Sequence, residues 1–287
     1  PVSVIKDAQA LAAKAFGADN AFFIVNGTTA AVQTMIFASV QAGQKIILPR
    51  NVHRSAINAL VVNGAVPVYV NPQVNPELGI PLGMRLADVE AAISANPDAK
   101  AVFVNNPTYY GICSDLRSIV ALAHAHNMLV LVDEAHGTHF YFSDKLPVSA
   151  MAAGADMAAA SIPKTGGSPT QSSVLLTRRP VDPDYIRQVI NLTQTTSASY
   201  LLIASLDLAR RNLHQNGRAM FEKTIQMADY ARGEVNDLGG YHAFGPELVN
   251  GDSVCAFDTT KLSVHTREIG LAGIEVYDLL RDDYGIQ

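Results

Sequence analysis

The sequence is poor in cysteine. Only two of its 287 residues are cysteines, Cys113 and Cys255. They lie far apart and form no metal-ligand spacing, so we expect two reduced thiols rather than a disulfide framework. Reduced thiols are typical of a cytoplasmic protein, and we expect that location.

Long hydrophobic runs and an excess of one charge are also missing. No stretch reaches the roughly 18 apolar residues of a membrane span, and the N-terminus lacks the pattern of a signal peptide. The 21 Lys and Arg against 26 Asp and Glu leave a net charge of -5. This balance gives no electrostatic reason to expect a nucleic acid or a membrane as a partner.

The chain begins with Pro1 rather than Met, which suggests a processed or truncated chain.

What the sequence does contain is a regular alternation of short apolar runs and helical patterns from residue 21 to residue 178. The apolar runs do not alternate with polar residues, so both faces of the sheet should be covered. We predict a three-layer α/β fold, a mainly parallel sheet with helices on both faces. The predicted strands are 21–25, 45–48, 65–70, 101–104, 129–132, 157–160 and 174–177, and the predicted helices between them are 30–40, 56–62, 86–94 and 116–126.

The pattern changes after Pro180 to longer helical stretches, and these lead into a short α+β region. Further helices are predicted at 184–192, 200–214, 220–238 and 272–284, and strands near 253–257 and 262–265. We therefore predict a large domain over residues 1–215 and the start of a small α+β domain over residues 216–287. Another strand would be expected after Gln287, so the small domain is expected to be incomplete.

Residues that follow the strands are the candidates for a site, because ligands bind at the carboxyl ends of the strands in parallel sheets. The first strand is followed by Asn26-Gly27-Thr28-Thr29-Ala30, a glycine turn that opens a helix and whose N–H groups and hydroxyls suit a phosphate. Helix capping by Thr28 or Thr29 explains this pattern about equally well. His53, after the second strand, is placed to lie over a flat ligand, although a lone histidine there is more often structural.

Two more distinctive groups follow the fifth and sixth strands. Asp133 at a strand tip can hold a protonated ring nitrogen by a charge-assisted hydrogen bond, and the small Ala135 would let a ring lie flat. Lys164 lies in the run Ser161-Ile162-Pro163-Lys164-Thr165-Gly166-Gly167-Ser168, a setting that no other lysine of the chain has. An acid and a lysine at consecutive strand tips are the strongest signal in the sequence.

Two other kinds of site compete for these residues. Asp133, His136 and His139 are a candidate metal site, but they lack a helical pair of histidines with a positioned base, so no metal is expected. The glycines near Lys164 resemble a nucleotide phosphate loop, but there the lysine follows the second glycine.

Taken together, the residues resemble the Orn/Lys/Arg decarboxylase family of pyridoxal-phosphate enzymes, which has the aspartate-aminotransferase fold, fold type I. The resemblance covers essentially the whole chain and is carried by FGADNAFFIVNGTTA, ILPRNVHRS, NPTYYG, VDEAHGTHF, GADMAAASIPKTGGSPTQSS and TTSASYLL.

The resemblance implies a role for each matching residue. Lys164 would bind pyridoxal 5'-phosphate covalently, Asp133 would pair with its ring nitrogen, and His53 and Ala135 would lie on opposite sides of the ring. The turn with Gly27 and Ala30 belongs to the cofactor site, and Thr28, Thr29 and Ser161 would hold the phosphate. His136 matches a position on the substrate side of the ring, so Lys164, Asp133 and His136 are the candidate catalytic residues.

The resemblance also implies a reaction and an assembly. The reaction is decarboxylation of arginine, lysine or ornithine to the amine and carbon dioxide. The assembly is a homodimer, with residues 171–173 and Tyr109-Tyr110 near the neighbour. The family usually has a histidine directly before the cofactor lysine, whereas this chain has Pro163 and so lacks one phosphate partner. Another pyridoxal-phosphate reaction, such as transamination or elimination, and a non-catalytic paralogue are the alternatives.

Overall fold

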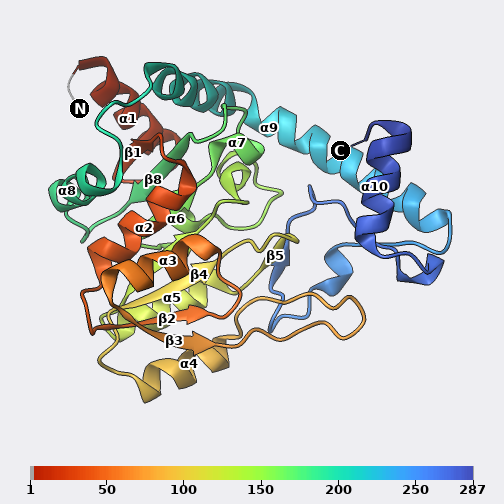
Figure 1. The fold of residues 1–287 in the computed structure, drawn as a ribbon, viewed down its shortest axis with the longest axis horizontal. Helices are drawn as coiled ribbons and strands as arrows, with labels where there is room; N and C mark the ends of the chain where they lie inside the picture. Colours follow the sequence, from red (N-terminus) through yellow and green to blue (C-terminus); the bar gives the residue numbers. More distant parts are fainter. Residues whose placement is uncertain (1–2, 287) are drawn as a thin grey trace.

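A seven-stranded sheet forms the centre of the computed structural model, which describes residues 3–286 (Figure 1). Pro1 and Gln287, at the outer ends of the two predicted domains, lie outside the described residues. The strands run in the order β1-β8-β7-β6-β4-β2-β3. Their bounds are β1 Asn20–Ile24, β2 Lys45–Pro49, β3 Val66–Val70, β4 Ala101–Asn105, β6 Leu129–Asp133, β7 Met157–Ala160 and β8 Ser173–Thr177. All seven strands predicted for this part of the chain are confirmed.

The sheet is parallel except at β8. The pairs β2–β3, β2–β4, β4–β6 and β6–β7 are parallel, whereas β8 is antiparallel to both of its neighbours, β7 and β1. The strand β1 therefore runs in the same direction as β7. This confirms the predicted mainly parallel sheet, and it puts the segment before β8 at the edge where the other strands end.

Helices cover both faces of the sheet, as its largely apolar strands require. In β4, Val102 and Val104 belong to one hydrophobic cluster, whereas Ala101 and Phe103 belong to the other. The first cluster includes residues of α1 (Ser3–Ala15), α4 (Leu86–Ala95), α5 (Leu116–Ala125), α6 (Ala150–Ala153) and α9 (Tyr200–Asp237). The second includes residues of α2 (Gly27–Ser39), α3 (Arg54–Asn63) and α8 (Pro183–Thr193). This is the predicted three-layer arrangement.

The predicted break between helices at residues 214 and 220 is wrong, because α9 runs without interruption from Tyr200 to Asp237. Gly217, inside the expected gap, is buried where the helix meets Phe142. A Cβ atom at Gly217 would lie 2.8 Å from the Cβ atom of Phe142. The glycine thus marks a close helix contact and not a helix end.

After α9 the chain contributes strands to two short antiparallel pairs and ends in a last helix. The strands β9 (His242–Phe244) and β11 (Ser263–His265) pair with each other, whereas β10 (Ala256–Phe257) pairs with β5 (Ile112–Cys113), just after β4. The helix α10 (Gly273–Tyr284) follows. We propose that residues 216–287 begin a small domain; its first residue lies inside α9. None of the helices of residues 3–286 is both long and apolar enough to cross a membrane.

Candidate active site

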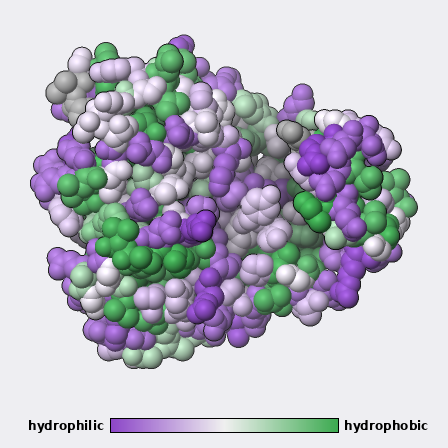
Figure 2. Space-filling view, viewed as in Figure 1, coloured by the Kyte–Doolittle hydropathy of each residue, from purple (hydrophilic) through white to green (hydrophobic). Residues whose placement is uncertain are grey.

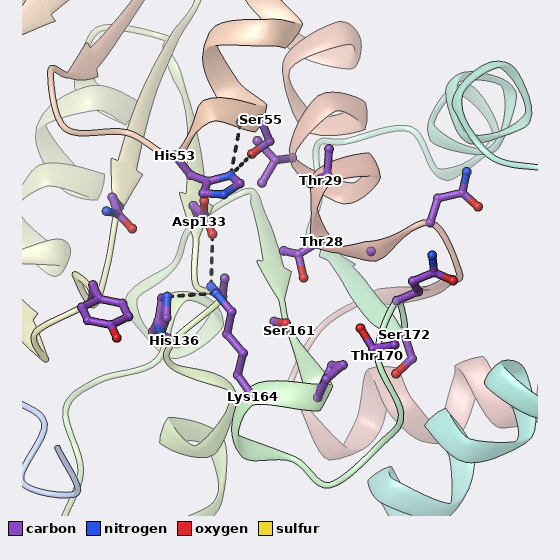
Figure 3. A pocket seen from close by; sticks show the side chains of 18 of the residues that line it. Thr28, Thr29, His53, Ser55, Asp133, His136, Ser161, Lys164, Thr170 and Ser172 are labelled. Carbon is purple, nitrogen blue, oxygen red and sulfur yellow. Dashed lines mark hydrogen bonds between the residues drawn. The ribbon is translucent and has the colours of Figure 1, made fainter. Parts of the chain in front are cut away.

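A cavity of about 610 Å³ lies where the loops after β1, β2, β4, β6 and β7 meet the loop before β8 (Figure 3). Figure 2 shows this face of the molecule hollowed between the body that carries α3 and the part that carries α10. The predicted site residues that line the cavity are Gly27, Thr28, Thr29, His53, Asp133, Ala135, His136, Ser161 and Lys164. Ala30 instead lies in the core between α2 and the sheet.

The first turn of α2 gives the cavity an anion-binding end. Gly27 has a φ of +74°, a conformation that favours glycine, and its N–H donates to the carbonyl of Gln171 at 2.8 Å. The helix begins at Gly27, so Thr28 and Thr29 lie inside its first turn and are not its caps. Within the described chain the Asn26 side chain makes no capping bond. The remaining N–H groups of this turn and the positive end of the helix dipole therefore suit a phosphate.

Asp133 ends β6 at the floor of the cavity and is only 4% exposed. Its Oδ1 accepts the N–H of Ala135 at 3.1 Å. Burial raises the pKa of Asp133, while the Ala135 hydrogen bond and the charges of Lys164 and His53 oppose that shift. A carboxylate in this setting gains by pairing with a cation, because burial otherwise disfavours its charge.

Lys164 and His136 contact each other across the cavity. The distance between Lys164 Nζ and His136 Nε2 is 2.9 Å (Figure 3). Burial and the charges of Lys164, Lys261 and His53 lower the pKa of His136 to about 4, so its ring is neutral at neutral pH and Nε2 accepts from the lysine. Desolvation in the pocket and, less strongly, Lys261 lower the pKa of Lys164, while Asp133 raises it.

His53 and Ser161 each lie directly before the first residue of a helix. His53 is the N-cap of α3, and its Nδ1 accepts the N–H of Ser55 at 3.2 Å and contacts the Ser55 hydroxyl at 2.8 Å. The ring is thus anchored through one nitrogen and lies at the cavity wall. Ser161 precedes the short helix α7 (Ile162–Thr165), and its hydroxyl makes no capping bond there. That hydroxyl stays free to face a ligand.

The cavity also contains residues that the sequence reasoning did not assign to the cofactor site. They include Asn51, Asn105, Tyr109, Thr170, Gln171 and Ser172. Asn51 follows β2 and Asn105 ends β4. A search of all residues at the carboxyl ends of the strands would therefore have found both. The same search would not have found residues 170–172, because they precede β8, which runs antiparallel to its neighbours. Residues expected near a neighbouring subunit, Tyr109 and Gln171, line this chain's own cavity.

The alternative metal site does not assemble. His139 lies in the 3-10 helix η1 (Thr138–Phe142), is 1% exposed, and its Nε2 is 2.9 Å from Oδ2 of the buried Asp258. It does not line the cavity with Asp133 and His136. In residues 3–286, no group of three or more His, Cys, Asp or Glu side chains has a metal-binding arrangement.

Comparison with known proteins gives matches over most or all of the chain. Residues 1–268 match the family model described as Orn/Lys/Arg decarboxylase, major domain. An arginine decarboxylase of Bacillus subtilis is 46% identical over 288 residues, which are all of this chain and 59% of that protein. The chain therefore spans less than two thirds of that relative's length.

Two solved structures share the fold. Lysine decarboxylase A from Pseudomonas aeruginosa superimposes with a TM-score of 0.76 at 26% identity, over 83% of this chain and 35% of that one. The constitutive lysine decarboxylase of Escherichia coli gives a TM-score of 0.78 at 21% identity, over 99% of this chain and 48% of that one. The second likeness is one of fold alone.

Proposed function

Because this chain belongs to the Orn/Lys/Arg decarboxylase family, we propose that it binds pyridoxal 5'-phosphate and removes the α-carboxyl group of a basic amino acid, arginine first among them. The 46% identity to an arginine decarboxylase supports arginine as the first substrate to test. The observation that carries the proposal is the meeting of Lys164 and Asp133 in one cavity, from neighbouring strand ends.

The residues of the cavity fit this cofactor. Asp133 is a buried carboxylate whose Oδ1 accepts the N–H of Ala135, and it would hold a proton on the ring nitrogen by a charge-assisted hydrogen bond. The first turn of α2, with Thr28 and Thr29, would hold the phosphate, together with the Ser161 hydroxyl. His53 and Ala135 would lie beside the ring. The chain thus offers groups for the ring nitrogen and for the phosphate of the cofactor.

Lys164 would bind the cofactor and later handle a proton. The neutral amine of Lys164 is the form that can attack as a nucleophile. Desolvation lowers the pKa of Lys164 and so favours this neutral form. When bound, pyridoxal phosphate supplies an electron sink for the pair left on the substrate Cα as the carboxylate departs. A proton must then reach Cα. With a pKa of about 4, His136 is not protonated at neutral pH and has no imidazolium proton to give, so the Lys164 ammonium is the better donor and His136 Nε2 orients it.

The test is an assay of carbon dioxide and amine release with L-arginine, L-lysine and L-ornithine. We expect release from at least one of them. Formation of a keto acid without carbon dioxide would favour transamination, and a protein without a visible cofactor band would favour a non-catalytic paralogue. Borohydride reduction and peptide mapping are expected to label Lys164, and a label on another lysine would overturn its assignment.

We also propose a homodimer in the cytoplasm, with no nucleic acid or membrane as a partner. The family resemblance supports the dimer. Two free cysteines, one of them buried, support a reducing compartment. Val61 and Val62 are 78% and 75% exposed on α3, where Figure 2 shows a hydrophobic area that a second subunit would cover.

A further inference from the structure

Two loops place His136 against Lys164. One is the loop after β6, which carries His136 itself and continues into η1. The other is the turn of residues 108–111 after β4, whose Tyr109 lines the cavity and packs its ring edge-on at 5.3 Å from that of His136. The contact of 2.9 Å between His136 Nε2 and Lys164 Nζ depends on where these loops lie. Whatever fixes the two loops also fixes the geometry of this pair.

The 3-10 helix η1 is joined to the chain that leads into Lys164. The buried Thr138 hydroxyl donates to the carbonyl of Ser161 at 3.0 Å. Thr138 follows His136 by two residues, and Ser161 precedes Lys164 by three. A shift of η1 would therefore change the position of His136 relative to Lys164.

The side chain of Asp258, directly after β10, holds η1 at a second point. Its Oδ2 accepts from His139 Nε2 at 2.9 Å, and both side chains are almost completely buried. The His139 ring packs against Phe140 and Phe221, with ring centroids 4.8 and 5.4 Å away. Within residues 3–286 its Nδ1 has no hydrogen-bond partner. The polar contacts of this ring are thus with Asp258 and with the Thr260 hydroxyl, both after β10.

The backbone of Asp258 holds the second loop. Its N–H donates to the carbonyl of Gly111 at 2.8 Å. Gly111 has a φ of +85°, and a Cβ atom there would lie only 3.2 Å from Asp258 Cβ. Asp258 Oδ1 accepts the N–H and the hydroxyl of Thr260 at 3.1 and 2.7 Å, which fixes the carboxylate. One buried residue therefore contacts both of the loops that place His136.

We propose that Asp258 is a positioning residue for the proposed reaction, on which this inference rests. Through His139 and Gly111 it keeps His136 Nε2 at hydrogen-bond distance from Lys164 Nζ. Asp258 is not among the residues that line the cavity, so it acts through its neighbours. A hydrogen bond weakens steeply when its distance and angle change, and a small misplacement of a reacting group lowers the rate. The Lys164 amine is thereby held where it can deliver its proton.

This role predicts that the effects of Asp258 and His136 on turnover do not add. We expect Asp258→Ala to lower kcat by about tenfold, the loss that corresponds to about one hydrogen bond. In a His136→Ala background the same substitution should change kcat by less than about twofold, because the contact that Asp258 preserves is already gone. A residue that only stabilised the fold would lower kcat by the same factor in both backgrounds.

The experiment is a double-mutant cycle on the holoprotein. We would measure kcat per bound cofactor, with the amino acid that the protein turns over, for the wild type, Asp258→Ala, His136→Ala and the double variant. The matched control is Asp156, another buried aspartate, whose Oδ2 lies 2.8 Å from His124 Nε2. Asp156 precedes β7 and so lies at the end of the sheet away from the cavity. Asp156→Ala should lower the melting temperature and leave kcat within about twofold of the wild type.

Equal losses of kcat in the two backgrounds, or no loss from Asp258→Ala alone, would overturn the proposal. If Asp258→Ala does not fold, His139→Phe removes the same hydrogen bond from the other side and enters the same cycle. An aromatic apolar ring suits that position, because Phe140 and Phe221 surround it.

A second measurement separates this proposal from the proposed function. A protein that releases no carbon dioxide from the three amino acids would refute the proposed reaction. The same cycle would then be run on the rate at which the apoproteins take up pyridoxal phosphate, because Lys164 reacts there without a substrate. We expect Asp258→Ala to slow uptake in the wild-type background and not in the His136→Ala background. Equal slowing in both, or none, would contradict the positioning role.

Discussion

At the scale of single residues, Asp133 is a buried acid whose charge needs a cationic partner. We expect Asp133→Asn to keep much of its cofactor and to lose most of its activity, because an amide does not hold the ring nitrogen as a cation. A charge-assisted hydrogen bond is worth about 1.5–3 kcal/mol, or roughly one to two decades in rate. The turnover rate of each preparation would be divided by its cofactor content, measured from the visible cofactor band. Wild-type turnover in the Asn variant would remove Asp133 from the mechanism.

Pro163 lines the cavity at the first turn of α7, at the position where the family resemblance implies a histidine. We expect Pro163→His to tighten pyridoxal-phosphate binding by about tenfold, close to 1.4 kcal/mol, because the imidazole adds a donor to the phosphate. Dissociation constants would come from absorbance titration of the apo forms. Pro163→Ala is the matched control, since it relaxes the backbone without adding a donor. Equal or weaker binding by the His variant would mean that Ser161, Thr28 and Thr29 already satisfy the phosphate.

At the scale of elements, α9 contains two glycines in opposite surroundings. A Cβ atom at Gly217 would press on Phe142 at 2.8 Å, whereas a Cβ atom at Gly233 would meet nothing within 4 Å. We expect Gly217→Ala to lower the free energy of unfolding by about 1–3 kcal/mol, because it overpacks the contact between α9 and η1. Gly233→Ala should raise that free energy by up to about 1 kcal/mol, because alanine is the better helix former. Denaturant unfolding of both variants tests this, and destabilisation of similar size in both would contradict it.

At the scale of the whole molecule, a buried acid links stability to pH. Glu134 is fully buried. Its Oε1 accepts the N–H of Ala150 at 2.8 Å, and the Tyr141 hydroxyl donates to its Oε2. Burial raises the pKa of Glu134 to about 8, and the two hydrogen bonds only partly offset that shift. The folded protein therefore keeps a proton on Glu134 that the unfolded chain releases above its ordinary pKa of about 4.3.

The sign of the effect follows from this difference in bound protons. From the ordinary pKa of Glu up to about 8, the contribution of Glu134 to the free energy of unfolding falls as the pH rises, and above that it is constant. We expect Glu134→Gln to remove this fall, so that the variant gains stability relative to the wild type toward neutral pH. Urea unfolding of both proteins across this window measures the two slopes, and parallel slopes would refute the raised pKa.

The assembly is also a property of the whole molecule. We expect a homodimer at micromolar concentration, and light scattering of the cofactor-loaded protein measures it. Replacing the exposed Val61 by Lys should weaken the dimer if α3 lies in the interface, because a charge there would lose its water. Leu192→Lys, on α8, is the matched control at an equally exposed apolar site. A wild-type monomer would contradict the proposal.

The sequence by itself determined the strands of the sheet and the residues at their ends. Apolar runs and glycine turns are local patterns, and in a parallel sheet the chain after each strand must reach the same edge, so Gly27, His53, Asp133 and Lys164 line one cavity. Asp133 and Lys164 could be assigned chemistry because they follow consecutive strands and because the family resemblance implies a role for each.

Only the tertiary structure decided the features that depend on contacts between distant segments. The reversed direction of β8 brings Gln171 to the cavity, and Phe142 packs on Gly217 inside an uninterrupted α9. The bond between His139 and Asp258 joins residues 119 positions apart and ties the segment after β10 to the loop after β6. No local pattern records such pairings, because their energy comes from burial and from partners that become neighbours only when the chain has folded.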